Sequence, residues 1–124
     1  MFTRMDHVAL HVADVPAAAD FYVNVLGFEK VYDSPGTGGS PIVYVRLGTS
    51  MIELTTRPSG EPMSGFHFGM ETADLATTMD TLKAHGLAVV TEPKLATPRG
   101  DRQKGWKRAV LRGPHGELIE IKGP

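Results

Sequence analysis

The sequence contains no cysteine, and its net charge is only -1. Without a thiol the protein can form no disulfide, bind no metal through a thiolate and use no cysteine nucleophile. A net charge near zero gives no electrostatic reason to expect a nucleic acid or an anionic membrane as partner. No apolar run approaches the ~20 residues of a membrane-spanning helix, and no secretory signal pattern is seen. We therefore expect a cytoplasmic protein that acts on a small molecule.

The chain has 124 residues, of which 41% are hydrophobic and 22% charged, as in an ordinary globular protein. This length suits one compact domain with a core and is too short for two independent ones. We predict a single domain over residues 1–124, built from two modules at residues 5–58 and 64–122.

The two modules are related by an internal repeat. A shift of sixty positions places His7 on His67 and Asp14 on Asp74. Each module also ends in an apolar strand pattern with one acid, MIEL with Glu53 and LIEI with Glu120. A repeated unit that supplies one histidine and one glutamate each time indicates a functional site.

Hydrophobic periodicity predicts the same order of elements in both modules, βαβββ. Asp14 and Asp74 are the expected N-caps of the helices, and Gly27 and Gly86 the residues that end them. The predicted helix of the first module covers 17–26, and that of the second begins after Asp74. The predicted strands cover 5–12, 28–32, 42–47 and 51–56, then 66–72, 87–91, 106–112 and 117–121.

Loops rich in Pro and Gly are predicted at 33–41, 57–65 and 92–105. The middle one is the expected linker between the modules. The third is long for a compact domain, which suits either a lid or binding loop or a surface hairpin without a function.

Strand side chains alternate between the two faces of a sheet, so parity predicts which residues share a face. His7 and Glu53 then lie on the polar face of the first module, and His67 and Glu120 on that of the second, opposite the apolar face that packs under the helix. Buried carboxylates need a cation or hydrogen-bond donors. Histidine with glutamate is a ligand set for zinc, nickel, manganese or iron, so we predict one divalent metal ion on these four residues.

The segments HVALHVADVPAAADFYVNVLGF (7–28) and LRGPHGELIEI (111–121) resemble the vicinal oxygen chelate superfamily, and within it the glyoxalase I group. The helix end DFY…LGF and the turn Gly113–Gly116 are the more specific marks. The resemblance runs from Met5 to Ile121. It implies an α+β fold in which two tandem βαβββ modules form a cup-shaped mixed sheet with the helices on the outer face. The cup forms within one chain or between the chains of a homodimer, and we expect a homodimer here.

The resemblance also implies that the ligands are His7, Glu53, His67 and Glu120, around an octahedral metal that leaves two positions for water or substrate oxygens. In such enzymes a carboxylate moves a proton next to a carbonyl through an enediolate. By position Glu120 is the expected base, and Glu53 a ligand and second base. The leading functional prediction is thus a glyoxalase I-like lyase or isomerase, similar to lactoylglutathione lyase, that acts on a hemithioacetal or 2-oxo compound.

The sequence departs from the glutathione-dependent pattern at two places. His11 stands where the family has an arginine for a substrate carboxylate, and Arg57 where it has an asparagine. The span 92–108 holds six basic residues against Glu92 and Asp101, which suits either steering of an anionic substrate or a solvated loop. Trp106 and Arg108 share a parity that turns both toward the cup. Expected substrate-binding residues are therefore His11, Arg57, Trp106 and Arg108.

Other functions of the same fold remain open. An epimerase of 2-substituted acyl thioesters needs the same proton chemistry, although relatives of that kind usually carry glutamine at the position of Glu53. Ring-cleaving dioxygenases and epoxide-opening antibiotic resistance enzymes leave that position without a ligand. Drug-binding proteins of the bleomycin resistance type generally lack the ligands altogether. The intact set of four favours the isomerases.

Overall fold

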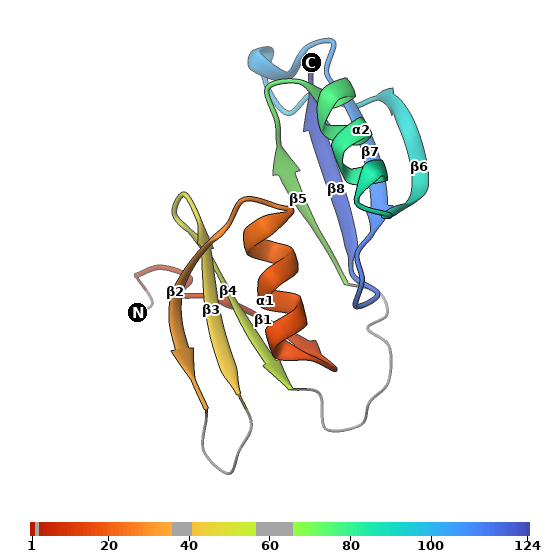
Figure 1. The fold of residues 1–124 in the computed structure, drawn as a ribbon. Helices are drawn as coiled ribbons and strands as arrows, with labels where there is room; N and C mark the ends of the chain where they lie inside the picture. Colours follow the sequence, from red (N-terminus) through yellow and green to blue (C-terminus); the bar gives the residue numbers. More distant parts are fainter. Residues whose placement is uncertain (2, 36–40, 57–65) are drawn as a thin grey trace. The chain divides into compact units, whose positions relative to one another are not determined.

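The computed structural model describes residues 1, 3–35, 41–56 and 66–124. It divides into two compact units, Met1–Pro62 and Met63–Pro124, each of which is described by itself below. Each unit has the order βαβββ (Figure 1). The predicted α+β class with two tandem βαβββ modules is confirmed; the single domain over 1–124 stays a prediction.

The elements of the first unit are β1 (Val8–Val12), α1 (Val15–Asn24), β2 (Glu29–Ser34), β3 (Ile42–Leu47) and β4 (Ser50–Thr56). Those of the second unit are β5 (His67–Glu71), α2 (Leu75–Ala84), β6 (Ala88–Leu95), the short 3-10 helix η2 (Asp101–Gln103), β7 (Lys107–Arg112) and β8 (Leu118–Gly123).

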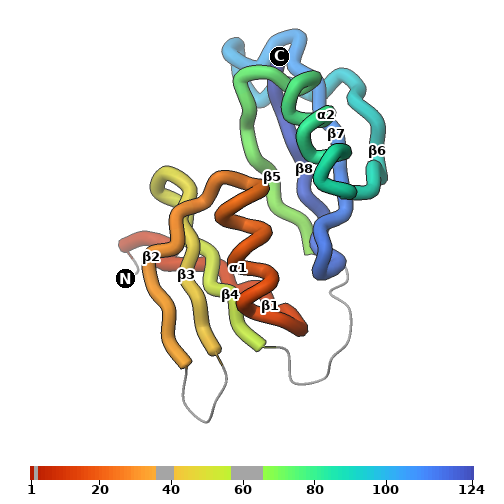
Figure 2. Tube along the Cα trace, viewed as in Figure 1, coloured from red at the N-terminus to blue at the C-terminus, as the bar shows by residue number. Residues whose placement is uncertain are grey.

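Each unit contains one mixed four-stranded sheet. The strand order is β1-β4-β3-β2 in the first and β5-β8-β7-β6 in the second. The first strand runs parallel to the last strand of its unit, and the other neighbours are antiparallel. The helix crosses over from the first strand to the far edge of the sheet, as Figure 2 shows for α1 and α2. The strand that carries each predicted glutamate is therefore central in its sheet.

The helices have the N-caps that the sequence predicts, although α1 covers Val15–Asn24 and not the predicted 17–26. The Asp14 carboxylate accepts the Ala17 N–H at 2.9 Å, and the Asp74 carboxylate accepts the Thr77 N–H at 3.0 Å. Gly27 and Gly86 follow the helices with φ of +78° and +84°, a backbone region that favours glycine because it has no Cβ. Both helices have ten residues, and within the described ranges no helix is long and apolar enough to cross a membrane.

The core lies between each helix and one face of its sheet. Alternate residues of the central strands are buried there, such as Ile52 and Leu54 on β4, and Ile119 and Ile121 on β8. In the first unit α1 packs on them with Ala18 and Tyr22. The side chains between them, Glu53 and Glu120, therefore point to the opposite face.

The loop predicted at 92–105 is shorter in the structure. Strand β6 continues through 92–95, which the sequence analysis assigned to the loop. Breaks in register between Val89 and Lys94 bend this strand, so its side chains do not keep the simple alternation from which strands are predicted. The remaining connection contains η2, and its buried Gln103 ties it to the sheet.

The core of the second unit provides a test of the packing. Leu111 on β7 is fully buried, whereas Leu95 on β6 is 74% exposed. We expect Leu111→Ala to lower the free energy of unfolding by about 2–5 kcal/mol, because it leaves a cavity. The same truncation at Leu95 should change it by less than about 0.5 kcal/mol. Urea unfolding followed by circular dichroism measures both, and equal losses would contradict this core.

Candidate functional site

The first unit brings His7 and Glu53 together on the polar face of its sheet. His7 directly precedes β1, and Ala9 on β1 lies beside Glu53 on β4 in the parallel register. The Nε2 atom of His7 is 3.3 Å from a carboxylate oxygen of Glu53. The other ring nitrogen lies 3.0 Å from the Asp6 carboxylate, which orients the imidazole. The pair thus presents one ring nitrogen and one carboxylate to the same point.

Tyr44 is a member of this group that the sequence analysis missed. It lies opposite Glu53 in the antiparallel register of β3 and β4, and its hydroxyl donates a hydrogen bond to the Glu53 carboxylate. Its ring also meets the His7 ring edge-on at 5.4 Å. The hydrogen bond to Glu53, with burial and the nearby negative charges, raises the pKa of Tyr44 to about 12. The register of the hairpin is the signal that would have identified it.

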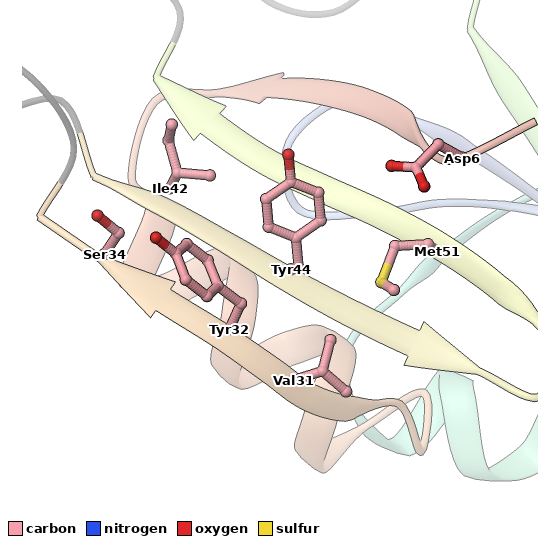
Figure 3. Close-up of a pocket in the computed structure, with 7 residues that line it drawn as sticks. All are labelled: Asp6, Val31, Tyr32, Ser34, Ile42, Tyr44 and Met51. Carbon is pink, nitrogen blue, oxygen red and sulfur yellow. The ribbon is translucent and has the colours of Figure 1, made fainter.

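A hollow of about 750 Å³ lies beside Tyr44 on this sheet (Figure 3). Tyr32 and Ile42 are on one side of Tyr44, and Met51 and Asp6 on the other. The register of β2 against β3 breaks between Lys30 and Tyr32, and Val31 lines the hollow together with Tyr32. The wall is mostly aromatic and apolar, so it suits an uncharged part of a ligand.

The second unit places Glu120 among cations. The Nζ atom of Lys122 is 3.0 Å from one carboxylate oxygen of Glu120, and Nη1 of Arg108 is 3.2 Å from the other. Glu120 lies beside Gly69 on β5, where an added Cβ would be 3.9 Å from the carboxylate. His67 starts the same strand and lines the same hollow of about 290 Å³. The absence of a side chain at Gly69 leaves room next to Glu120.

Burial alone would raise the pKa of Glu120. The hydrogen bond from Lys122 and the positive charges of Lys122, Arg108 and His67 outweigh it, so the pKa lies below its usual range. Glu120 is therefore ionised at neutral pH although only 17% of its side chain is exposed. Lys122 was not predicted, although its parity on β8 is that of Glu120.

The other predicted substrate-binding residues have different environments. His11 is exposed on β1, with the same parity as His7. Arg108 faces Glu120, as described above. Trp106 is half-buried, and the Arg102 guanidinium lies over its ring at 4.9 Å. Arg57 lies outside the described residues.

The donor atoms suit a divalent cation, with one imidazole and one carboxylate in each unit. Within the part of the chain that the structure describes, no group of three or more His, Asp or Glu side chains is arranged so that it could hold a metal ion. Each unit thus offers half of the predicted ligand set. In the first half the His7 nitrogen and the Glu53 oxygen are already adjacent. In the second, a cation on Glu120 would replace the ion pair with Lys122.

Known proteins resemble this chain over most of its length. The family model of the glyoxalase/bleomycin resistance protein/dioxygenase superfamily matches residues 4–121. An ethylmalonyl-CoA/methylmalonyl-CoA epimerase of Cereibacter sphaeroides is 35% identical over 111 positions, covering 77% of this chain and 81% of that protein. The mitochondrial methylmalonyl-CoA epimerase of Homo sapiens is 39% identical over 66 positions, covering 51% of this chain and 37% of that protein.

Solved structures share the fold of this chain, and the first of them is a member of the same superfamily. A member from Sphaerobacter thermophilus has a TM-score of 0.79 at 22% identity, with 99% of this chain and 98% of the other covered. An antibiotic binding protein from a Streptomyces species has a TM-score of 0.76 at 26% identity, with 99% and 97% covered. A fosfomycin resistance protein from Listeria monocytogenes has 0.75 at 16%, with 100% and 95% covered.

The contact between Tyr44 and Glu53 makes a prediction for the metal-free protein. Replacing the charged acceptor in Glu53→Gln should lower the pKa of Tyr44 from about 12 toward its ordinary 10.0, because a phenolate would no longer face a carboxylate. Titration of the phenol by near-ultraviolet absorbance, with Tyr44→Phe as the reference, measures this. Glu29→Gln is the matched control, since Glu29 pairs with Arg46 instead. An unchanged Tyr44 titration in Glu53→Gln would contradict the hydrogen bond.

Proposed function

Because this chain belongs to the glyoxalase/bleomycin resistance protein/dioxygenase superfamily, we propose that it is a metal-dependent epimerase of 2-substituted malonyl-type CoA thioesters. The observation that carries the proposal is the setting of Glu120, a half-buried and ionised carboxylate beside an open hollow that also contains cations. A base that is ionised and shielded from bulk water is what proton removal next to a thioester requires. Two epimerases among the similar proteins act on substrates of this class, by their names.

The proposal includes one divalent metal ion, held by His7, Glu53, His67 and Glu120. Nickel, zinc, manganese and iron all accept nitrogen and carboxylate ligands of this kind. When bound, the ion supplies a positive charge that stabilises the negative charge developing on the substrate oxygens. The hydrogen bond from Tyr44 to Glu53 and the contact between Glu53 and His7 support this part, because they hold Glu53 and His7 toward one point.

The chain's own residues carry the proton transfer. Glu120 accepts the proton from the carbon next to the thioester carbonyl, and the electron pair of the broken C–H bond moves into the enolate. For the return step Glu53 first takes up a proton from water, and it then donates this proton to the opposite face of that carbon, which inverts its configuration. After one turnover Glu120 is protonated and Glu53 is ionised, so the same pair runs the reverse reaction. Lys122 and Arg108 balance the charge of Glu120 when it is ionised.

A glyoxalase I-like isomerase is the second candidate. It is favoured by Glu53, which stands where epimerases of this superfamily usually have glutamine. The enolate chemistry is shared, and the proton returns to the neighbouring carbon instead of the same one. The substrate would then be a hemithioacetal or a 2-oxo compound.

The proposal also includes a homodimer. The outer strands of both sheets expose apolar side chains, Val31 and Tyr32 on β2, and Val90 and Leu95 on β6. Such exposed strands suit pairing with a second chain. We expect light scattering after size exclusion to give twice the chain mass of 13.4 kDa. A mass of one chain at all concentrations would contradict the dimer.

The decisive measurement is epimerisation of methylmalonyl-CoA by chelator-stripped protein, before and after addition of nickel, zinc or manganese. Activity should appear only with metal. Glu120→Gln should lower it by about 10²–10⁴-fold, the usual contribution of a positioned base. Glu92→Gln is the matched control, because Glu92 is exposed on β6. Among the described residues its carboxylate forms one ion pair, with Lys83 at 3.9 Å.

The outcomes separate the candidates. Full activity in Glu120→Gln would reject the assignment of the base. Turnover of the methylglyoxal–glutathione hemithioacetal, without epimerisation, would select the glyoxalase I-like reaction. Inactivity on both substrates with metal bound would reject both.

A further inference from the structure

The hollow of the second unit, taken together with the residues that pair with its two acids, has more positive than negative side chains. Two carboxylates, Glu71 and Glu120, line it. Arg99 and Lys122 line it as well, and Arg102 and Arg108 contact the two acids from outside the lining. Four cations thus meet two acids, so the hollow attracts a negatively charged ligand.

The two acids already have their cations. The Arg102 guanidinium donates to both oxygens of Glu71 at 3.0 and 2.9 Å, and Lys122 and Arg108 pair with Glu120. Arg99, by contrast, forms no ion pair of 4 Å or less with any described residue. Its charge contributes to lowering the pKa of Glu71, but only after the hydrogen bond and charge of Arg102 and the bond from Gln103. The guanidinium of Arg99 is therefore available to a ligand.

Gln103 fixes the backbone that carries Arg99. Only 7% of this residue is exposed, and its side chain makes two hydrogen bonds, one within the loop and one to the sheet. The side-chain oxygen accepts the Arg99 N–H at 3.1 Å, and the side-chain nitrogen donates to Glu71 at 3.1 Å. Arg102, stacked on Trp106, adds the two bonds to Glu71. The backbone of Arg99 is therefore already fixed before a ligand binds, which reduces the entropy lost on binding.

We propose that Arg99 binds the free carboxylate of the acyl-CoA substrate. This inference rests on the proposed function and assigns the residue that recognises the carboxylate of its malonyl-type substrate. In a malonyl-type thioester the carboxylate is attached to the carbon from which Glu120 takes the proton. A cation for that carboxylate must then lie in the same hollow as Glu120, as Arg99 does. Arginine suits this role because its planar group can donate two parallel hydrogen bonds to a carboxylate.

The test compares two thioesters that differ only at this group. Methylmalonyl-CoA has the carboxylate, and isobutyryl-CoA has a methyl group in its place, so the contribution of the CoA phosphates cancels. Dissociation constants are measured by calorimetry on the zinc-loaded protein. We expect the wild type to bind methylmalonyl-CoA more tightly, and Arg99→Gln to reduce that preference by about 10- to 100-fold, the cost of a lost hydrogen bond to a charged group. Arg99→Lys should keep part of it.

Lys107→Gln is the matched control. It removes one positive charge from β7, at an exposed residue that lies on the same face of the strand as the buried Ala109 and Leu111. It should leave the preference unchanged. Gln103→Leu should weaken binding of methylmalonyl-CoA but not of isobutyryl-CoA, which separates positioning of Arg99 from a general loss of structure.

The results bear on this inference and on the proposed function separately. A preference that disappears in Arg99→Gln supports the carboxylate subsite even if no epimerisation is detected. Epimerisation by the wild type, with Arg99→Gln retaining the full preference, overturns the subsite and leaves the proposed function intact. Equal affinity of the wild type for both thioesters also overturns it.

Discussion

The alternation of side chains along β4 and β8 is the constraint on which the candidate site depends. On each strand one acid stands between two buried aliphatic residues, Ile52 and Leu54 around Glu53, and Ile119 and Ile121 around Glu120. Moving either strand by one residue would turn its acid into the core, at a cost of several kcal/mol. The packing of α1 and α2 therefore also decides which face receives the carboxylates.

The two units repeat the same βαβββ backbone arrangement, but their glutamates have different partners. Glu53 accepts a hydrogen bond from the neutral hydroxyl of Tyr44, whereas Glu120 pairs with the cations Lys122 and Arg108. The same strand position thus carries two carboxylates with different electrostatics. Groups that differ in this way can divide the roles of proton donor and acceptor, which the proposed epimerisation needs.

Prediction from the sequence succeeded where the signal is local. The caps at Asp14 and Asp74 depend on neighbouring residues only, and they are found as predicted. Strand β6 was predicted too short, since its bent register hides the alternation. On function, the sequence favoured a hemithioacetal as substrate, whereas the function proposed above takes an acyl thioester. Both reactions depend on the same proton chemistry, and residue types alone do not distinguish between their substrates.

The sequence by itself determined the repeat, the α+β order of elements and the parity that places His7, Glu53, His67 and Glu120 on polar faces. These features follow from the hydrophobic periodicity and from residues that are close to one another in the sequence. Only the tertiary structure decided the partners of the acids, because Tyr44 lies nine positions from Glu53, and Arg102 is 31 positions from Glu71. Such pairs depend on strand register and on the path of a loop, and no local pattern specifies either.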